Sequence, residues 1–159
     1  MNKVYLLLGS NLQDPVEQIY KAEKEIDNAI GKIDKKSSLY QTAAWGKRDQ
    51  PDFINRVVVC TTNLSADQTL EKILDIEKKM GRRRTEKNSP RIIDIDILFF
   101  GRQIIDTGKL QIPHPLMADR RFVLTPLCEL SPSFKHPVTK KTVRQMLEES
   151  SDPLDVKRI

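Results

Sequence analysis

The sequence predicts an α+β fold, a ferredoxin-like sandwich in which helices pack on one face of an antiparallel sheet and short helices follow at the C-terminal end. Short apolar runs alternate with two amphipathic stretches of similar length, in the order strand, helix, strand, strand, helix, strand. That order allows both long helices to cover the same face of one sheet. The 159 residues, 38% hydrophobic and 31% charged, suit one domain over residues 1–159.

The first half of the chain predicts a strand, a helix and a second strand. The apolar run 4–8 is typical of a buried strand. Asp14 is placed to cap a helix, Pro15 suits the first helical position, and an apolar stripe continues to a stop at Gly31. We expect the second strand over residues 38–42.

The second half predicts two more strands around a second helix. A strand over residues 54–62 precedes this helix, which begins after the cap Ser65 and ends at Gly81. The basic stretch 82–91 has no apolar periodicity, so we expect a mobile loop, and residues 92–100 carry the clearest strand signal. The remaining segments are turns at 101–119, short helices at 122–130 and 142–148, and a polar tail from Ser150 that we expect to fray.

The charge balance favours an anionic partner. The net charge is +5, and basic proteins bind nucleic acids, nucleotides and phosphorylated metabolites. No aromatic side chain interleaves with the densest basic cluster, which disfavours an interface for single-stranded nucleic acid. The cluster comprises Arg82, Arg83, Arg84, Lys87 and Arg91.

The compartment follows from the apolar runs and the cysteines. No apolar run is long enough to span a bilayer, and the N-terminal residues lack the pattern of a secretory signal. Cys60 and Cys128 lack metal-site spacing, and Cys60 ends the apolar run 57–59, so we expect a buried free thiol. We therefore expect a cytoplasmic protein without a membrane partner. Separately, we expect a monomer that has no nucleic-acid partner.

Asp94 and Asp96 form an acidic pair inside the strongest predicted strand. Alternation places both carboxylates on one face, roughly 7 Å apart along the strand. Strands disfavour Asp, and neighbouring like charges repel, so the pair needs compensation. Two magnesium ions that bridge the carboxylates to a nucleotide would supply it. The alternative is a pair of edge carboxylates neutralised by nearby arginines.

The arginine-rich loop comes directly before this acidic strand. Guanidinium groups suit the bidentate capture of phosphate oxygens, so the loop is placed to close over a triphosphate. A solvated basic loop is the alternative. His114 and Arg120 are candidates for further phosphate contacts, although His114 taken alone fits a structural role as well.

Phe53 and Asn55 are candidates for recognising a flat heterocycle. If the strand begins near Asp52, the two side chains face the same side. An aromatic face beside an amide suits a ring with mixed hydrogen-bond donors and acceptors. The alternative places Phe53 in the core and Asn55 in a turn.

Taken in order, these motifs resemble the hydroxymethyl-dihydropterin pyrophosphokinase family, and the resemblance covers nearly the whole chain. The matching N-terminal motifs are Leu8-Gly9-Ser10-Asn11-Leu12, Tyr40-Gln41-Thr42, Trp45-Gly46 and Asp49-Gln50-Pro51-Asp52-Phe53-Ile54-Asn55. The matching C-terminal motifs are Glu77, Gly81-Arg82, Arg84, Pro90-Arg91-Ile92-Ile93-Asp94-Ile95-Asp96-Ile97-Leu98, Pro113-His114-Pro115, Arg120, Phe122-Val123-Leu124 and Pro126-Leu127.

The resemblance implies transfer of the β,γ-diphosphate of ATP to the hydroxymethyl group of 6-hydroxymethyl-7,8-dihydropterin, with release of AMP, in folate biosynthesis. It implies that Asp94 and Asp96 bind two Mg²⁺ ions. The implied pterin-binding residues are Thr42, Ala43, Ala44, Trp45, Phe53, Asn55 and Phe122. The implied ATP-binding residues are Glu77, Arg82, Arg84, Arg91, Ile97, His114 and Arg120. The implied catalytic residues are Arg82, Arg84, Arg91, Asp94 and Asp96.

Three departures from the family pattern concern the edges of the site. Asn88-Ser89 stands where the family usually has Trp-Gly, so we expect less complete closure of the loop over ATP. Ala43 and Ala44 stand where many members have prolines, which predicts a looser pterin-side loop. Leu74 stands where some members carry a polar nucleotide contact.

Two other functional classes fit part of the sequence. A ferredoxin-like RNA- or DNA-binding module explains the basic loop, but Asp94 and Asp96 would repel phosphates in the absence of a metal. A regulatory domain that binds a small molecule without catalysis is the third reading, and AMP release would exclude it.

Overall fold

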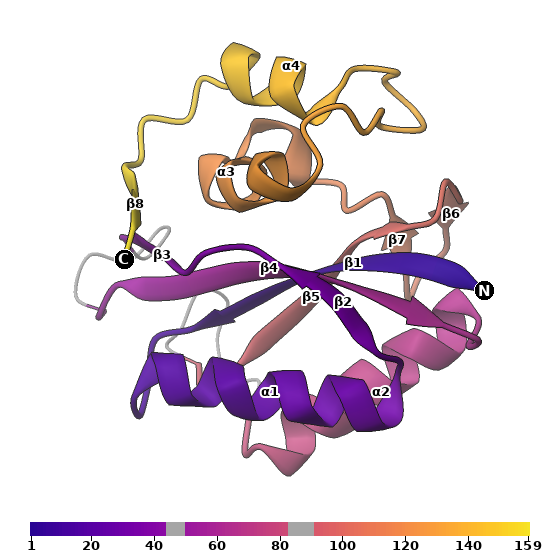
Figure 1. Cartoon of the computed structure of the whole chain (residues 1–159), viewed down its shortest axis with the longest axis vertical. Coiled ribbons are helices and arrows are strands. Elements are labelled where there is room, and N and C mark those ends of the chain that lie inside the picture. Colours follow the sequence, from indigo (N-terminus) through magenta and orange to yellow (C-terminus); the bar gives the residue numbers. More distant parts are fainter. Residues whose placement is uncertain (44–49, 83–90) are drawn as a thin grey trace.

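A mixed sheet-and-helix layer structure is seen in the computed structural model, which describes residues 1–43, 50–82 and 91–159 (Figure 1). Within these residues, a six-stranded antiparallel sheet has the order β5-β1-β4-β3-β8, and β2 also pairs with β4. The strands are β1 (Asn2–Ser10), β2 (Ile33–Lys36), β3 (Tyr40–Thr42), β4 (Phe53–Thr62), β5 (Asp94–Phe100) and β8 (Val156–Arg158).

Helices cover both faces of this sheet. In Figure 1, α1 (Pro15–Ala29) and α2 (Ala66–Lys79) lie on one face, and α3 (Arg121–Leu130) and α4 (Val143–Glu149) lie on the other. Successive side chains of a strand point to opposite faces, and β1 therefore feeds two apolar cores. Leu6 packs in the core under α1 and α2, while Leu7 packs in the core under α3 and α4.

The helix starts and the fold class predicted from the sequence are confirmed. Asp14 accepts a hydrogen bond from the Glu17 N–H at 3.4 Å, and Pro15 is the first residue of α1. Ser65 and Gln68 cap α2 reciprocally, which satisfies two otherwise unpaired backbone N–H groups. Cys60 is buried and free, and burial raises the pKa of its thiol to about 12.

Several strand boundaries differ from the sequence prediction. The strand expected over residues 38–42 begins at Tyr40, and the strand expected from Ile92 begins at Asp94. Strand β2 was not predicted, because three of its four residues are exposed and charged and its pairing with β4 is interrupted by a register shift. The segment 101–119 contains a small hairpin, β6 (Ile105–Asp106) and β7 (Gln111–Ile112), and a 3-10 turn at Met117–Asp119.

The expectation that the tail frays from Ser150 is wrong. Asp152 is buried, and β8 pairs with β3 at the edge of the sheet. Ser151 donates its backbone N–H to the Asp119 carboxylate at 2.9 Å, which fixes the tail where it leaves α4. The polar side chains that suggested disorder are the groups that anchor this segment. No helix in the described part of the chain has the length and apolar character needed to cross a membrane.

Gly31 gives a test of how closely the end of α1 packs on β4. A Cβ atom at Gly31 would lie 2.0 Å from the backbone oxygen of Thr61, a main-chain atom that cannot rotate away. We predict that Gly31→Ala destabilises the fold by about 1–3 kcal/mol through overpacking. Thermal unfolding should show this as a fall in Tm of roughly 2–4 °C per kcal/mol.

The matched control is Gly108→Ala, because a Cβ at Gly108 would meet nothing within 4 Å. Its Tm should stay close to that of the wild type. An equal fall in both variants would mean that the Gly31 contact is not responsible.

Candidate active site

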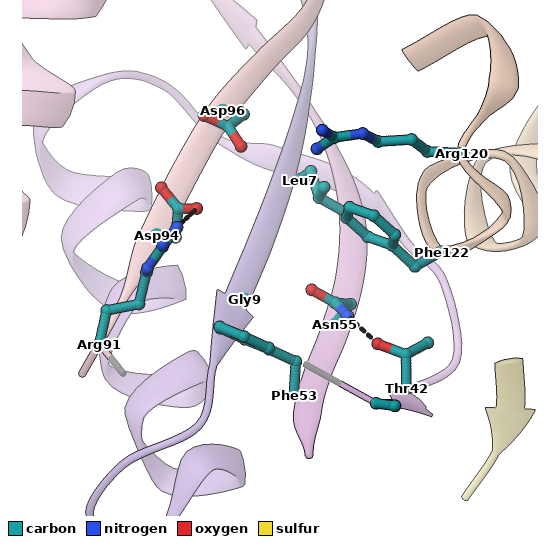
Figure 2. A pocket seen from close by; sticks show the side chains of 11 residues that line it. Leu7, Gly9, Thr42, Phe53, Asn55, Arg91, Asp94, Asp96, Arg120 and Phe122 are labelled. Carbon is teal, nitrogen blue, oxygen red and sulfur yellow. Dashed lines mark hydrogen bonds and ion pairs between the residues drawn. The ribbon is translucent and has the colours of Figure 1, made fainter. Parts of the chain in front are cut away.

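A cavity opens between one end of the sheet and the start of α3, and we call it the aromatic cavity (Figure 2). Strands β1, β3, β4 and β5 supply its floor and two sides, and α3 with its N-cap residue supplies the remaining wall. The lining residues are Leu7, Gly9, Thr42, Ala43, Phe53, Asn55, Arg91, Asp94, Asp96, Arg120 and Phe122.

The register of the sheet sets the spacing of the functional side chains. Gly9 of β1 pairs with Asn55 of β4 on one side and with Asp94 of β5 on the other. These residues therefore form one row across three strands, with neighbouring strands roughly 4.8 Å apart. A Cβ at Gly9 would lie 2.6 Å from the Asn55 side-chain oxygen, so only glycine leaves room for that amide.

The aromatic and amide residues predicted from the sequence face this cavity together. The buried Asn55 side chain donates a hydrogen bond to the Thr42 hydroxyl at 3.2 Å. Figure 2 shows the ring of Phe53 on one side of Asn55 and the ring of Phe122 on the other. The interpretation of Phe53 as a core residue and Asn55 as a turn residue is therefore wrong.

An arginine lies over each aromatic ring. The Arg91 guanidinium carbon is 5.7 Å from the centroid of Phe53, and that of Arg120 is 5.7 Å from the centroid of Phe122. Such contacts hold a cation beside an aromatic face. The cavity therefore combines apolar walls with positive charge.

Asp94 lies at the centre of an ion-pair network. Arg82 donates to the Asp94 carboxylate at 2.8 Å and to Glu77 at 2.6 Å, while Arg91 donates to the other Asp94 oxygen at 2.9 Å. Glu77 is buried and also accepts the backbone N–H of Ile95 at 2.9 Å. Pairing with arginines, one of the two interpretations of the acidic pair, thus describes Asp94 in the free protein.

Asp96 is electrostatically different from Asp94. Its burial, together with the negative charges of Asp94 and Glu77, raises the pKa of Asp96 to about 8, although Arg82 and Arg91 act in the opposite direction. A carboxyl group in this state carries a proton at neutral pH. A cation placed between Asp94 and Asp96 would favour the ionised form, so the donor chemistry suits a hard metal ion.

A second cavity lies between α2, β5 and the β6–β7 hairpin, and we call it the hairpin cavity. Glu77, Ile97 and His114, three residues expected to bind nucleotide, line it. Its other lining residues are Leu70, Ile73, Leu74, Ile95, Asp96, Thr107, Gly108, Lys109, Leu110, Gln111 and Pro115. Among the described residues, Asp96 alone lines both cavities, so the two spaces adjoin at this residue.

His114 is held in a fixed orientation at the edge of the hairpin cavity. Its Nδ1 accepts the backbone N–H of Leu116 at 3.2 Å, and its own backbone N–H donates to Leu98. Burial and the positive charge of Arg120 lower the pKa of His114. The imidazole is therefore neutral at physiological pH, and its value to an anion is as a hydrogen-bond donor.

The structure groups the sequence candidates by cavity. Arg82 lines neither cavity and reaches the site through its ion pairs with Glu77 and Asp94. Five of the residues singled out in the sequence lie outside the described residues, namely Ala44, Trp45, Arg84, Asn88 and Ser89. The same holds for residues 83–90 of the basic stretch that we expected to be a mobile loop.

Asn11 is a positioning residue to which the sequence reasoning gave no role. It is almost completely buried, and its Oδ1 accepts the backbone N–H of Arg91 at 2.9 Å. Its Nδ2 donates to Gln50 at 2.9 Å and to the Pro51 carbonyl at 3.2 Å. It therefore ties the start of the acidic strand to the segment that leads into Phe53. The sequence signal that could have singled out Asn11 is its place directly after Gly9-Ser10, at the end of the first strand.

Comparison with known proteins adds independent support for a family. The model of the 7,8-dihydro-6-hydroxymethylpterin-pyrophosphokinase (HPPK) family matches residues 5–132. A 2-amino-4-hydroxy-6-hydroxymethyldihydropteridine pyrophosphokinase of Aquifex aeolicus is 38% identical over 151 residues, which cover 95% of this chain and 94% of the relative. The enzyme of the same description from Haemophilus influenzae is 35% identical, with 96% and 95% of the two chains covered.

Some relatives are much longer proteins. The folic acid synthesis protein FOL1 of Dictyostelium discoideum is 40% identical over 91% of this chain, which spans only 22% of that protein. A crystal structure of Plasmodium falciparum HPPK-DHPS superimposes with a TM-score of 0.74 at 20% identity, covering 94% of this chain and 43% of the other. This structural likeness shows the fold alone. The match to the family model and the relatives covered over nearly their full length show that the chain belongs to the 7,8-dihydro-6-hydroxymethylpterin-pyrophosphokinase family.

Proposed function

We propose that this chain transfers the β,γ-diphosphate of ATP to the hydroxymethyl oxygen of 6-hydroxymethyl-7,8-dihydropterin and releases AMP, with the pterin in the aromatic cavity and ATP in the hairpin cavity. The observation that carries the proposal is the position of Asp96, which lines both cavities. Two substrates bound in these spaces would bring their reacting groups together beside one carboxylate.

The aromatic cavity suits a pterin in shape and chemistry. Phe53 and Phe122 both line this cavity and supply aromatic rings for stacking on a flat heterocycle, and Asn55 offers an amide to its polar edge. Thr42 and Ala43 line the cavity beside this amide. We assign Ala44 and Trp45 to the same side from the family resemblance.

The hairpin cavity suits the nucleoside, with its phosphates directed toward Asp96. Ile97 offers apolar contact and backbone groups, and Glu77 is a fixed acceptor at the base of α2. Arg82, Arg91 and Arg120 surround the acidic pair and provide the positive charge that phosphate oxygens require. We assign Arg84 to the same task from the resemblance, and His114 donates at the cavity edge.

The acidic pair fits two Mg²⁺ ions shared with ATP. The described residues contain no group of three or more His, Cys, Asp or Glu side chains arranged to hold a metal without other ligands. Asp94 and Asp96 would therefore hold Mg²⁺ together with phosphate oxygens and water, which is the usual manner of magnesium binding. When bound, the metal neutralises charge on the phosphates during transfer.

The described residues act mainly by positioning the substrates. Phe53, Phe122 and Asn55 orient the hydroxymethyl group toward Asp96. The arginines align the triphosphate, so that the hydroxymethyl oxygen bonds to the β-phosphorus as the bond from that phosphorus to the oxygen that leaves with AMP breaks. The hydroxyl proton passes to solvent. Positioning and charge neutralisation dominate phosphoryl transfer, and we assign no general base.

The direct test is to incubate the protein with ATP, Mg²⁺ and 6-hydroxymethyl-7,8-dihydropterin and to separate the products. The proposal requires AMP and the pterin diphosphate in equal amounts. Formation of ADP would indicate transfer of a single phosphoryl group, and ATP binding without AMP would favour a non-catalytic domain.

Removal of either carboxylate should nearly abolish turnover. A metal contributes several kcal/mol of charge stabilisation in the transition state, so Asp94→Asn and Asp96→Asn should each lower kcat by about 100-fold or more. AMP production at saturating substrates and Mg²⁺ measures the effect. Near-normal turnover in either variant would refute the metal assignment.

The same two variants should affect stability in opposite directions without metal. The pKa of Asp96 is raised on folding, so the folded protein keeps a proton that the unfolded chain loses. Stability is therefore lost as the pH rises from about 4 toward 8. Asp96→Asn removes this penalty, so its Tm should exceed that of the wild type at pH 8 but not below pH 4.

Asp94→Asn should instead lower the Tm at pH 8, because it takes the charged partner from Arg82 and Arg91. Melting curves in a metal-free buffer across this pH range compare the two variants. If the stability of Asp96→Asn relative to wild type does not change with pH, the electrostatic account of Asp96 is wrong.

The two cavities should respond separately to truncation. Phe53→Ala and Phe122→Ala should raise the Kd for the pterin by about tenfold to a hundredfold, the value of one stacked aromatic, and leave the Kd for ATP nearly unchanged. Leu74→Ala, which trims the hairpin cavity, should affect ATP alone. Titration of each ligand into each variant provides the comparison, and equal losses for both ligands would assign the aromatic residues to the core.

A further inference from the structure

The C-terminal segment 150–158 leaves α4 and crosses to the far edge of the sheet, where β8 lies beside β3 (Figure 1). We call this segment the C-terminal strap. It lies beyond residue 132, where the match to the family model ends. Along its course it contacts two elements that line the aromatic cavity, namely β3 and the start of α3.

Asp152 of the strap caps α3. Within the described part of the chain, the side chain of the N-cap residue Arg120 makes no capping hydrogen bond. The buried Asp152 supplies one instead, because its Oδ2 accepts the backbone N–H of Arg121 at 3.0 Å. First-turn N–H groups lack partners within their helix, and a carboxylate there also favours the helix dipole. The other Asp152 oxygen accepts the N–H of Leu154 at 3.0 Å.

The strap makes a second attachment at Asp119, the residue before Arg120. Ser151 donates its backbone N–H and its hydroxyl to the Asp119 carboxylate, and Ser150 donates to the Asp119 carbonyl at 2.9 Å. These bonds hold the pKa of Asp119 below its ordinary value. Arg120 follows directly, so the strap fixes the backbone on both sides of the residue that lies over Phe122.

The other end of the strap holds β3. Val156 pairs with Thr42, and Arg158 pairs with Tyr40. Glu129 of α3 joins the two elements, since it accepts hydrogen bonds from the Tyr40 hydroxyl and from the Ser38 backbone, and it pairs with Arg158 at 3.2 Å. The Arg158 side chain is 61% exposed, so this ion pair contributes little compared with the buried cap.

We propose that the C-terminal strap positions the pterin-binding walls, and that Asp152 is a positioning residue for Phe122 and Arg120. The proposal rests on the placement of the pterin in the aromatic cavity. The sheet row of Asp94, Gly9 and Asn55 is fixed by strand pairing on both sides. The start of α3 has no such ladder, and the strap supplies the constraint.

The test compares Asp152→Ala with Asp155→Ala in the full chain. Both variants remove one negative charge from the strap, but Asp155 is exposed and has no role in capping α3. Loss of a helix cap should raise the KM for 6-hydroxymethyl-7,8-dihydropterin about fivefold in Asp152→Ala. The KM for ATP should change by less than about twofold, as should both KM values in Asp155→Ala.

Asp152→Asn is the second test variant, because its single amide oxygen can still accept one of the two hydrogen bonds. Its KM for the pterin should lie closer to the wild-type value than that of Asp152→Ala. It serves in place of Asp152→Ala if that variant does not fold. A Tm loss with unchanged KM values, or with both KM values raised by one factor, would overturn the proposal. If Phe53→Ala also leaves the pterin KM unchanged, the placement of the pterin itself has failed.

Discussion

The site depends on the charge balance between carboxylates and guanidinium groups at the start of β5. Asp94 and Asp96 share one strand face with Glu77 nearby, and this much negative charge cannot be buried without compensation. In the free protein, Arg82 and Arg91 neutralise Asp94, while Asp96 retains its proton. Binding of Mg²⁺ and ATP would exchange these ion-pair partners: the carboxylates would bind the cations, and the arginines would bind the phosphates.

The sheet converts this electrostatic arrangement into geometry. Because β1 is paired on both sides, the row through Gly9 fixes the distance from Asp94 to Asn55 without any side-chain contact between them. Gly9 keeps the centre of that row open, and the start of α3 supplies a wall of the cavity. The Asn55 amide and the acidic pair are thus held by backbone hydrogen bonds, whereas the position of Phe122 depends on the attachment of α3 to the C-terminal strap.

Local sequence patterns predicted most of the fold and much of the site. Period-two alternation placed Asp94 with Asp96 and Phe53 with Asn55 on shared faces, and both pairs line the aromatic cavity. Patterns of neighbouring residues could not reveal the strap, because the bond from Arg121 to Asp152 joins residues 31 positions apart and the contact from Tyr40 to Arg158 joins residues 118 apart. Strand β2 was also missed, because its exposed charged residues carry no local strand pattern and its conformation depends on pairing with β4.

The central claim is that the two cavities meet at Asp96 and hold the two substrates on either side of it. A crystal structure with a non-hydrolysable ATP analogue, Mg²⁺ and 6-hydroxymethyl-7,8-dihydropterin tests this directly. The account predicts the pterin between Phe53 and Phe122, Mg²⁺ on Asp94 and Asp96, and the hydroxymethyl oxygen about 3–3.5 Å from the β-phosphorus. A pterin bound outside the aromatic cavity, or metal held without these carboxylates, would contradict it.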